Sequence, residues 1–357
     1  MRCGIIGLPQ SGKTTLFQIL TRSAPSESHR HGETQHIGIV PVPDSRLDQL
    51  VEIFTPDKTT YATVEYADVA AIGKEALKES AYLNTLRNLD SLLHVVRVFR
   101  NDAVPHVKNT IDPGRDIEDL NLDLILTDLT TIENRELKLE KDRKKAKNPD
   151  HEREQAVLVK ARQWLEAGKP LREAEWAEDE KKRIKGFAFL SEKPMLLVLN
   201  AGEEMLGESD EVLRSYGQNE PKPNTLAVVV CGKLEAELAL MSNAEIKEFL
   251  QGFSLKEPPT QRVIRATLDL MGYICFLTAG EKECRAWSIP KGSTAVQAAG
   301  AIHSDIEKHF IRAEVIYWQD LIDAGSFAAA KQKGILRLEG KEYLVKDGDV
   351  LTIRHSG

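Results

Sequence analysis

The feature that most constrains this chain is a glycine-rich motif near its start, Gly7-Leu8-Pro9-Gln10-Ser11-Gly12-Lys13-Thr14. The motif matches the pattern G-x-x-x-x-G-K-[ST]. It follows a short apolar run at 2–6 and opens a segment of helical spacing. A strand, a glycine loop and a helix in this order form the context in which such a loop cradles phosphates. The motif therefore predicts an α/β fold of the P-loop nucleoside triphosphatase (NTPase) class.

The residue types of the motif predict its chemistry. Gly7 and Gly12 let the backbone wrap closely around phosphate groups, and the start of the helix adds positive potential. The Lys13 ammonium is expected to reach the β- and γ-phosphates, and the Thr14 hydroxyl to ligate Mg²⁺. The predicted nucleotide-binding residues of this segment are Gly7, Pro9, Gln10, Ser11, Gly12, Lys13, Thr14 and Thr15.

A second Mg²⁺ ligand is expected at the end of a neighbouring strand. Asp68 follows the alternating run 62–67 and fits that position, with a helix cap as its alternative role. We predict that Lys13 and Asp68 are the catalytic residues. Ala71 stands where a glycine usually senses the γ-phosphate, and Ile72 stands where a glutamine usually orients water. We therefore predict a slow ATPase, and the alternative is a nucleotide-binding adaptor with little or no hydrolysis.

Base selection is predicted from the segment Asn200-Ala201-Gly202-Glu203, which follows the apolar run 195–199. GTPases usually carry N-K-x-D here, and the aspartate pairs with N1–H and N2–H₂ of guanine. Glu203 is one methylene longer and the lysine is absent, which weakens the case for guanine. ATP is the predicted nucleotide, and GTP is the alternative. Asn200, Glu203 and Gly232, which lies in a loop after a later strand, are predicted to surround the base.

The order of apolar and helical segments predicts the frame of the nucleotide-binding domain. Buried-strand patterns at 91–99, 194–200 and 225–231 alternate with helical segments. Such alternation is typical of a mostly parallel sheet with helices on both faces. His94 lies inside one of these strands, so we interpret it as a core histidine rather than a catalytic one. This domain is predicted to comprise 1–118 and 190–272.

A highly charged insertion at 119–189 interrupts that domain. Helical patterns at 120–147 and 150–167 are separated by Asn148-Pro149, which predicts an antiparallel coiled-coil arm. The apolar residues at helical spacing on the first helix are Leu122, Leu126, Leu129 and Ile132. Basic residues gather near the predicted tip, and they are either a solvated helical face or a contact for RNA or another polyanion. The residues of this cluster are Lys141, Arg143, Lys144, Lys145 and Lys147.

The last part of the chain, 273–357, changes to short strands and turns. Strand patterns at 273–278 and 284–289 are followed by a helix from Thr294, whose apolar face extends to Phe310. Three further strand-like segments complete the chain. This order predicts a small α+β domain of the β-grasp type.

Composition narrows the cellular setting. The chain of 357 residues has a net charge of −7, which argues against a wholly basic nucleic-acid binder. It has no apolar run long enough to span a membrane and no signal-peptide pattern, so a cytoplasmic protein without a membrane contact is expected. The four cysteines are widely spaced and are predicted to be buried free thiols.

Together these residues resemble the YchF family of Obg-related P-loop ATPases. The segments that carry the resemblance are 7–14, 40–44, Asp68, 94–97, 200–203 and 233–238. Four C-terminal segments are similar to the family's ubiquitin-like TGS domain, and they are 285–287, 297–300, 310–315 and 338–341. The resemblance implies a G domain with an inserted coiled-coil arm and a C-terminal TGS domain. It also implies ATP preferred over GTP, slow hydrolysis, and the ribosome or its RNA as partner.

The chain departs from the family pattern at three places. Its phosphate loop ends in Gln-Ser-Gly-Lys-Thr rather than Asn-Val-Gly-Lys-Ser, and Ala71 replaces a glycine. The glycine-rich stretch that normally follows is shortened to 73–79, which weakens the case for a nucleotide-driven switch. The threonine expected in the first switch falls near Gly32, and Thr34 is the candidate Mg²⁺ ligand in its place.

Overall fold

The computed structural model divides the chain into two compact units. The first unit comprises Met1–Gly38 and Glu65–Leu270, and the second comprises Ile39–Val64 and Met271–Gly357. The structure describes residues 1–22, 35–70, 76–144, 148–218, 220–238, 241, 243–252, 255 and 257–356. No helix in these residues is long and apolar enough to cross a membrane. The domain boundaries proposed from the sequence, with the arm at 119–189, stay predictions.

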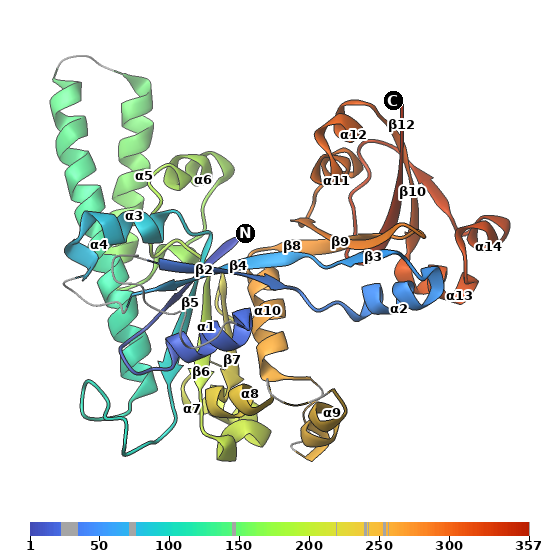
Figure 1. Cartoon of the computed structure of the whole chain (residues 1–357). Coiled ribbons are helices and arrows are strands. Elements are labelled where there is room, and N and C mark those ends of the chain that lie inside the picture. Colours follow the sequence, from blue (N-terminus) through green and yellow to red (C-terminus); the bar gives the residue numbers. More distant parts are fainter. Residues whose placement is uncertain are drawn as a thin grey trace. The chain divides into compact units, whose positions relative to one another are not determined.

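The first unit is built on a six-stranded sheet in the order β2-β4-β1-β5-β6-β7 (Figure 1). The strands are β1 (Arg2–Ile6), β2 (Gln35–Pro41), β4 (Thr63–Val69), β5 (Ser91–Arg97), β6 (Met195–Asn200) and β7 (Thr225–Val230). The pairs β1–β4, β1–β5, β5–β6 and β6–β7 are all parallel. Every residue of β5 and β6 is buried, as expected of central strands covered on both faces. The predicted mostly parallel α/β sheet is confirmed.

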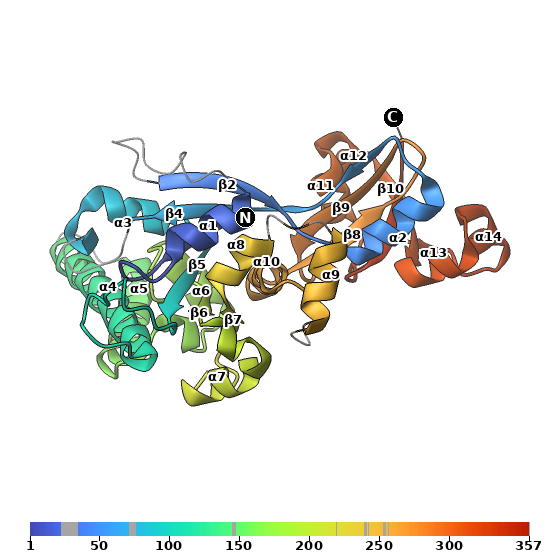
Figure 2. The same cartoon turned by 60° about the horizontal axis from the view of Figure 1, so that its bottom comes forward.

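Helices surround this sheet, and some of them directly follow strands that lead to the candidate site. The helix α1 (Lys13–Thr21) follows β1 and contacts α8 (Gly232–Leu238), which follows β7 (Figure 2). The other helical elements of this layer are η2 (Ala76–Lys78), α3 (Ser80–Arg87), η4 (Glu203–Glu208), α7 (Ser209–Ser215), α9 (Asn243–Gly252) and α10 (Pro259–Leu270). Because the strands are parallel, the loops after β1, β4, β6 and β7 emerge at one edge of the sheet.

The inserted arm is a pair of helices that lie side by side, α4 (Pro113–Arg143) and α5 (Pro149–Glu166) (Figure 1). The shorter elements η3 (Leu171–Glu173) and α6 (Glu178–Lys185) follow them. The break between the helices falls at the predicted Asn148-Pro149 pair, where Asn148 caps α5 and Pro149 begins it. The predicted helical arm is confirmed.

The apolar seam of the arm differs from the one predicted. Leu122 and Leu126 are 49% and 48% exposed, so their predicted place on the buried face is wrong. The other two predicted residues are confirmed, because Ile132 is fully buried and Leu129 packs partly buried against the same cluster. Ile125 and Leu139 complete a seam with Ile132 that recurs every seven residues and packs on α5 and its neighbours. Both sets fit a helical period, and the sequence could not distinguish them because a strict seven-residue seam is narrower than a general amphipathic face.

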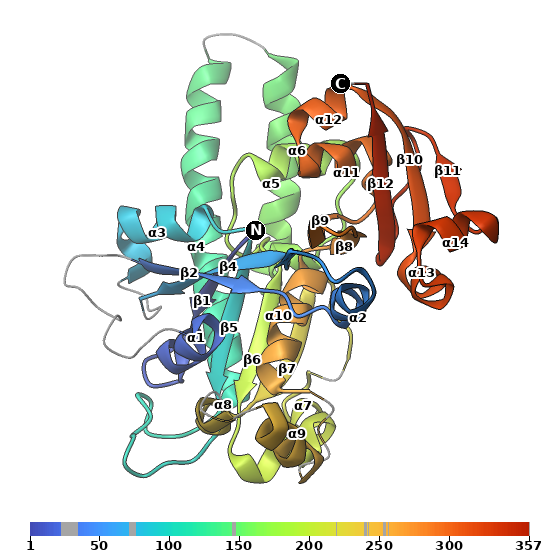
Figure 3. The ribbon, with the colours of Figure 1, turned by 45° about the vertical axis from the view of Figure 1, so that its right-hand side comes forward.

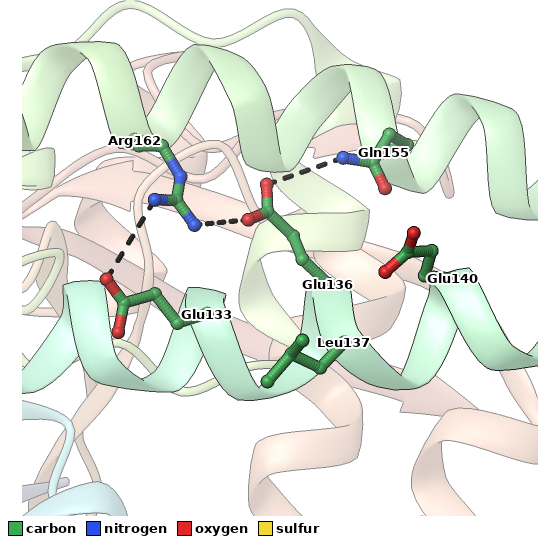
Figure 4. Close-up of a pocket in the computed structure, with 6 residues that line it drawn as sticks. All are labelled: Glu133, Glu136, Leu137, Glu140, Gln155 and Arg162. Carbon is green, nitrogen blue, oxygen red and sulfur yellow. Dashed lines mark hydrogen bonds and ion pairs between the residues drawn. The ribbon is translucent and has the colours of Figure 1, made fainter.

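Polar side chains between the two arm helices pair mostly with one another. Figure 4 shows a pocket of about 570 Å³ lined by residues of both helices. Arg162 on α5 is ion-paired with Glu136 and Glu133 on α4, and Gln155 donates a hydrogen bond to Glu136 at 3.4 Å. These contacts link α4 and α5. We therefore interpret the polar side chains that line the pocket as structural contacts of the arm.

The second unit is an α+β domain around a mixed sheet in the order β11-β10-β12-β8-β9-β3. Its C-terminal strands are β8 (Tyr273–Thr278), β9 (Glu283–Pro290), β10 (Phe310–Tyr317), β11 (Arg337–Glu339) and β12 (Asp349–His355). The helix α11 (Ala295–Ile302) packs its alanines on the sheet, and it lies with α12 (Ser304–Lys308) on one side of β10 and β12 (Figure 3). Two helices that the sequence did not predict, α13 (Trp318–Ala324) and α14 (Phe327–Gln332), follow β10. A C-terminal domain with a β-sheet and a packed helix is confirmed.

The predicted single helix from Thr294 is in fact interrupted. Thr294 caps α11 through a capping box with Gln297, as its position suggested. His303 is extended and separates α11 from α12, and Phe310 begins a strand rather than continuing the helical face. The apolar period runs through this break because both helices and the strand contact the same core.

The segment Ile39–Val64 belongs to the second unit although it lies early in the chain. Its helix α2 (Ser45–Phe54) begins after Asp44, whose side chain accepts a hydrogen bond from the backbone N–H of Arg46 and so caps the helix. Phe54 contacts Phe327 with ring centroids 5.5 Å apart, and α2 lies beside α13 (Figure 2). Its short strand β3 (Lys58–Thr60) pairs in parallel with β9. A strand of three residues is too short to show an alternating pattern, so this pairing could not be predicted from the sequence.

Candidate nucleotide-binding site

The glycine-rich loop between β1 and α1 has a backbone that requires its two motif glycines. Gly7 and Gly12 have φ angles of 144° and 98°. A Cβ atom at Gly7 would lie 2.5 Å from the carbonyl oxygen of Val95, and one at Gly12 would overlap the Asn200 amide. Both positions therefore exclude a side chain for steric as well as conformational reasons. Pro9, Gln10 and Thr15 are exposed around the loop, while Ser11 is buried beneath it.

Lys13 is buried against this loop. Its side chain is 8% exposed, and its ammonium donates a hydrogen bond to the Leu8 carbonyl at 2.8 Å. Burial lowers the pKa of Lys13 to about 8, and the charge of Asp68 opposes part of that shift. The ammonium is thus held at the loop in a partly desolvated setting, where its attraction for an anion is strengthened.

Thr14 and Asp68 come together at the same edge. The strands β1 and β4 are neighbours in register, with Ile5 opposite Asp68. The Thr14 hydroxyl donates to a carboxylate oxygen of Asp68 at 3.3 Å, and Asp68 is 7% exposed. One hydroxyl and one carboxylate are hard oxygen ligands of the kind that Mg²⁺ prefers. They are too few to form an all-protein cage, which fits an ion shared with phosphates and water, and no cluster of three acidic, histidine or cysteine ligands occurs among the described residues.

Asn200 joins the phosphate loop to the loop after β7. Its side-chain amide donates to the Ser11 carbonyl at 2.9 Å and accepts from the backbone N–H of Gly232 at 3.0 Å. Asn200 is 6% exposed, so both ends of the amide are used inside the protein. Asn200 and Gly232, which were predicted to surround the base, lie in hydrogen-bond contact, and Asn200 also acts as a clamp between the phosphate loop and the loop after β7. Their contact with a base stays a prediction.

Glu203 lies three residues further along and is paired with a residue absent from the predicted site. Its carboxylate is 2.9 Å from the ammonium of Lys233, the residue after Gly232. We call the loop after β6, which carries Glu203, and the loop after β7, which carries Gly232 and Lys233, the base-side loops. The available signal in the sequence was Lys233 itself, next to the predicted Gly232. It was missed because nothing in the sequence places the two loops in contact. The parallel pairing of β6 with β7 brings them together.

Other predicted residues fall into two groups. His94 is 1% exposed, and burial lowers its pKa to about 3, which confirms a neutral core histidine. The four cysteines are buried free thiols, as predicted. Ala71, Ile72 and Thr34 lie outside the described residues, as do Lys145 and Lys147 of the basic cluster.

Relatives of known identity match the chain over nearly its whole length. The "Ribosome-binding ATPase YchF" of Bacillus subtilis (strain 168) is 39% identical over 365 residues, which cover 99% of each chain. The chain belongs to the YchF family. The YchF protein of Escherichia coli O157:H7, with the same name, is 40% identical over 98% of each chain. In this chain, residues 2–128 match a family model described as "50S ribosome-binding GTPase", and residues 273–356 match YchF-GTPase_C, described as a protein of unknown function (DUF933).

Solved structures agree with this YchF membership. The structure of the Schizosaccharomyces pombe YchF GTPase has a TM-score of 0.83 at 27% identity and covers 99% of this chain and 97% of its own. A GTP binding protein from Pyrococcus horikoshii OT3 has a TM-score of 0.58 at 18% identity over the full length of both chains, which shows a shared fold. The Bacillus subtilis and Escherichia coli relatives are named as ATPases and the Schizosaccharomyces pombe protein as a GTPase, so these names do not determine the base preference of this chain.

Proposed function

We propose that this chain is a Mg²⁺-dependent purine-nucleotide-binding protein that hydrolyses ATP slowly to ADP and phosphate. The observation that carries the proposal is the convergence of Lys13, Thr14 and Asp68 at one edge of the sheet, with Thr14 and Asp68 3.3 Å apart. The 39–40% identity to proteins named ribosome-binding ATPases supports the same conclusion over the full length.

The residues have separate roles in this proposal. The Lys13 ammonium and the loop N–H groups hold the phosphates and stabilise the negative charge that develops on the transferred group. Thr14 and Asp68 hold Mg²⁺, which neutralises phosphate charge when it is bound. Asn200 keeps the base-side loop against Ser11, and Glu203 and Gly232 contribute to base binding. ATP is proposed as the preferred nucleotide because Glu203 replaces the shorter aspartate used for guanine.

Single-turnover hydrolysis of labelled ATP tests the enzymatic part of the proposal. Phosphate release above the rate without protein is expected, and Lys13→Ala should abolish it. Ala71 and Ile72 favour the second candidate, an adaptor that binds nucleotide with little or no hydrolysis. If phosphate release were no faster than in buffer while ATP binding was normal, the adaptor function would be supported instead.

Ribosome association is proposed because these relatives are named as ribosome-binding proteins. A cytoplasmic location without a membrane contact is part of the same proposal. Co-sedimentation with purified 70S ribosomes tests this part directly. The chain is expected in the ribosomal pellet with ATP and Mg²⁺, and recovery only in the supernatant under every nucleotide condition would contradict the proposal.

A further inference from the structure

The ion pair between Lys233 and Glu203 is the part of the candidate site to which the proposed mechanism gives no role. The Lys233 ammonium is 2.9 Å from Oε1 of Glu203, and the two side chains are 74% and 39% exposed. An ion pair this exposed contributes little to folding stability. Its location beside the base-side loops makes ligand recognition the better explanation.

Asn200 determines where this pair stands. Because its amide binds Ser11 on one side and Gly232 on the other, the loop after β7 is fixed next to the phosphate loop. Lys233 directly follows the clamped glycine, and Glu203 begins the element that follows Asn200. One N–H and the carbonyl oxygen of the Asn200 side chain bind backbone, and Asn200 is only 6% exposed. Glu203 and Lys233 are the more exposed polar groups beside it, so they are the better placed to contact a base.

Adenine and guanine require different partners from a carboxylate and an ammonium. The Watson–Crick edge of guanine presents two adjacent donors, N1–H and N2–H₂, which match the two oxygens of one carboxylate. Adenine presents one donor group, its N6 amine, beside the ring acceptors N1 and N7. A carboxylate with one oxygen held by an ammonium offers one acceptor beside one donor, and this arrangement is complementary to adenine.

We propose that Lys233 is a specificity-determining residue that selects adenine over guanine. By holding Oε1 of Glu203 it withholds the second acceptor that guanine needs, and it supplies a donor for a ring nitrogen of adenine. The inference rests on the proposed function, because it concerns the base of the nucleotide whose phosphates the glycine-rich loop holds. It adds to that proposal a residue and a reason for the preference.

The test compares the full-length protein with Lys233→Ala and Lys233→Arg. Dissociation constants for ATP, GTP and inosine triphosphate are measured by calorimetry with Mg²⁺. In Lys233→Ala, the affinity for GTP relative to the affinity for ATP should rise about tenfold over the wild-type ratio, because both Glu203 oxygens become available. The gain should be larger for GTP than for inosine triphosphate, which lacks the N2 amine. Lys233→Arg should keep the wild-type ratio, because a guanidinium also pairs with the carboxylate.

The outcomes separate this inference from the proposed function. If Lys233→Ala binds ATP and GTP with the wild-type ratio, the inference fails while nucleotide binding stands. Equal gains for GTP and inosine triphosphate would also overturn it, because the second donor of guanine would then be irrelevant. Failure of the wild type to bind any of the three nucleotides would instead refute the proposed function itself.

Discussion

The phosphate loop and the base-side loops of this chain are built in different ways. The phosphate loop is one continuous segment in which each residue acts through its own backbone or side chain, and its glycines have the positive φ angles that the motif requires. The base side is assembled from two segments about 30 residues apart in sequence, joined by Asn200 and by the Lys233–Glu203 ion pair. The first kind of site is encoded locally, whereas the second depends on the order of strands in the sheet.

This difference has a consequence for function. The phosphates of all nucleoside triphosphates are alike, so a continuous loop can bind any of them without reading the base. In our proposal, base preference depends on how Glu203 is presented, and the neighbouring loop controls this through Lys233, whose ammonium is 2.9 Å from the carboxylate. Changes in the phosphate loop should therefore affect all nucleotides equally, and changes at Lys233 should affect their ratio.

Lys13→Ala is expected to have the largest effect. Removing the buried ammonium should lower the affinity for ATP and the affinity for GTP by at least about 100-fold each, because charge-assisted contacts to phosphate are lost. Calorimetric titration with both nucleotides measures this, and Lys138→Ala, an exposed lysine on α4, is the matched control. If the variant lost affinity for only one of the two nucleotides, the proposed difference between the phosphate loop and the base-side loops would be contradicted.

Asn200→Ala is expected to have the next largest effect. It leaves the buried Gly232 N–H and the Ser11 carbonyl without their partner, so the two regions are no longer joined. The affinity for ATP and the affinity for GTP should both fall by about 10- to 100-fold.

Asn200→Asp separates the two bonds of that clamp. It keeps an acceptor for Gly232 but loses the donor to Ser11. Nucleotide binding that is lost in the alanine variant and partly kept in the aspartate variant would identify the Gly232 bond as the more important one. Unchanged binding in both variants would show that Asn200 does not position the site.

The pH dependence of ATP binding gives a smaller effect that is specific to the phosphate loop. The pKa of Lys13 is lowered to about 8 without nucleotide, so the ammonium is mostly charged below that pH. Above it the protein must take up a proton to bind phosphates, and the affinity should fall about tenfold between pH 7.5 and 9. Titrations at pH 9 in two buffers of different ionisation enthalpy should reveal proton uptake, and its absence would place the Lys13 pKa elsewhere.

The sequence was sufficient where a function or an element is local. The phosphate loop, Asp68 at the end of its strand, the buried strand runs and the Asn-Pro break in the arm are all short patterns with a direct physical meaning. The structure agrees with the predicted placement of each of these features.

It was insufficient where distant segments meet. The pairing of β3 with β9 joins residues more than 220 positions apart, and β3 has only three residues. The role of Asn200 as a clamp and the contact of Lys233 with Glu203 both follow from the adjacency of β6 and β7, which no local pattern states. The apolar seam of the arm was misassigned only at Leu122 and Leu126, because two sets of apolar positions that share Ile132 both fit a helical spacing.

The most direct test of the account is calorimetric titration of the wild-type protein with ATP and with GTP in the presence of Mg²⁺. Both nucleotides should bind, removal of Mg²⁺ should weaken the binding of both, and ATP should bind more tightly than GTP. Binding of neither nucleotide would contradict the assignment of the phosphate loop, and tighter binding of GTP would contradict the assignment of the base side.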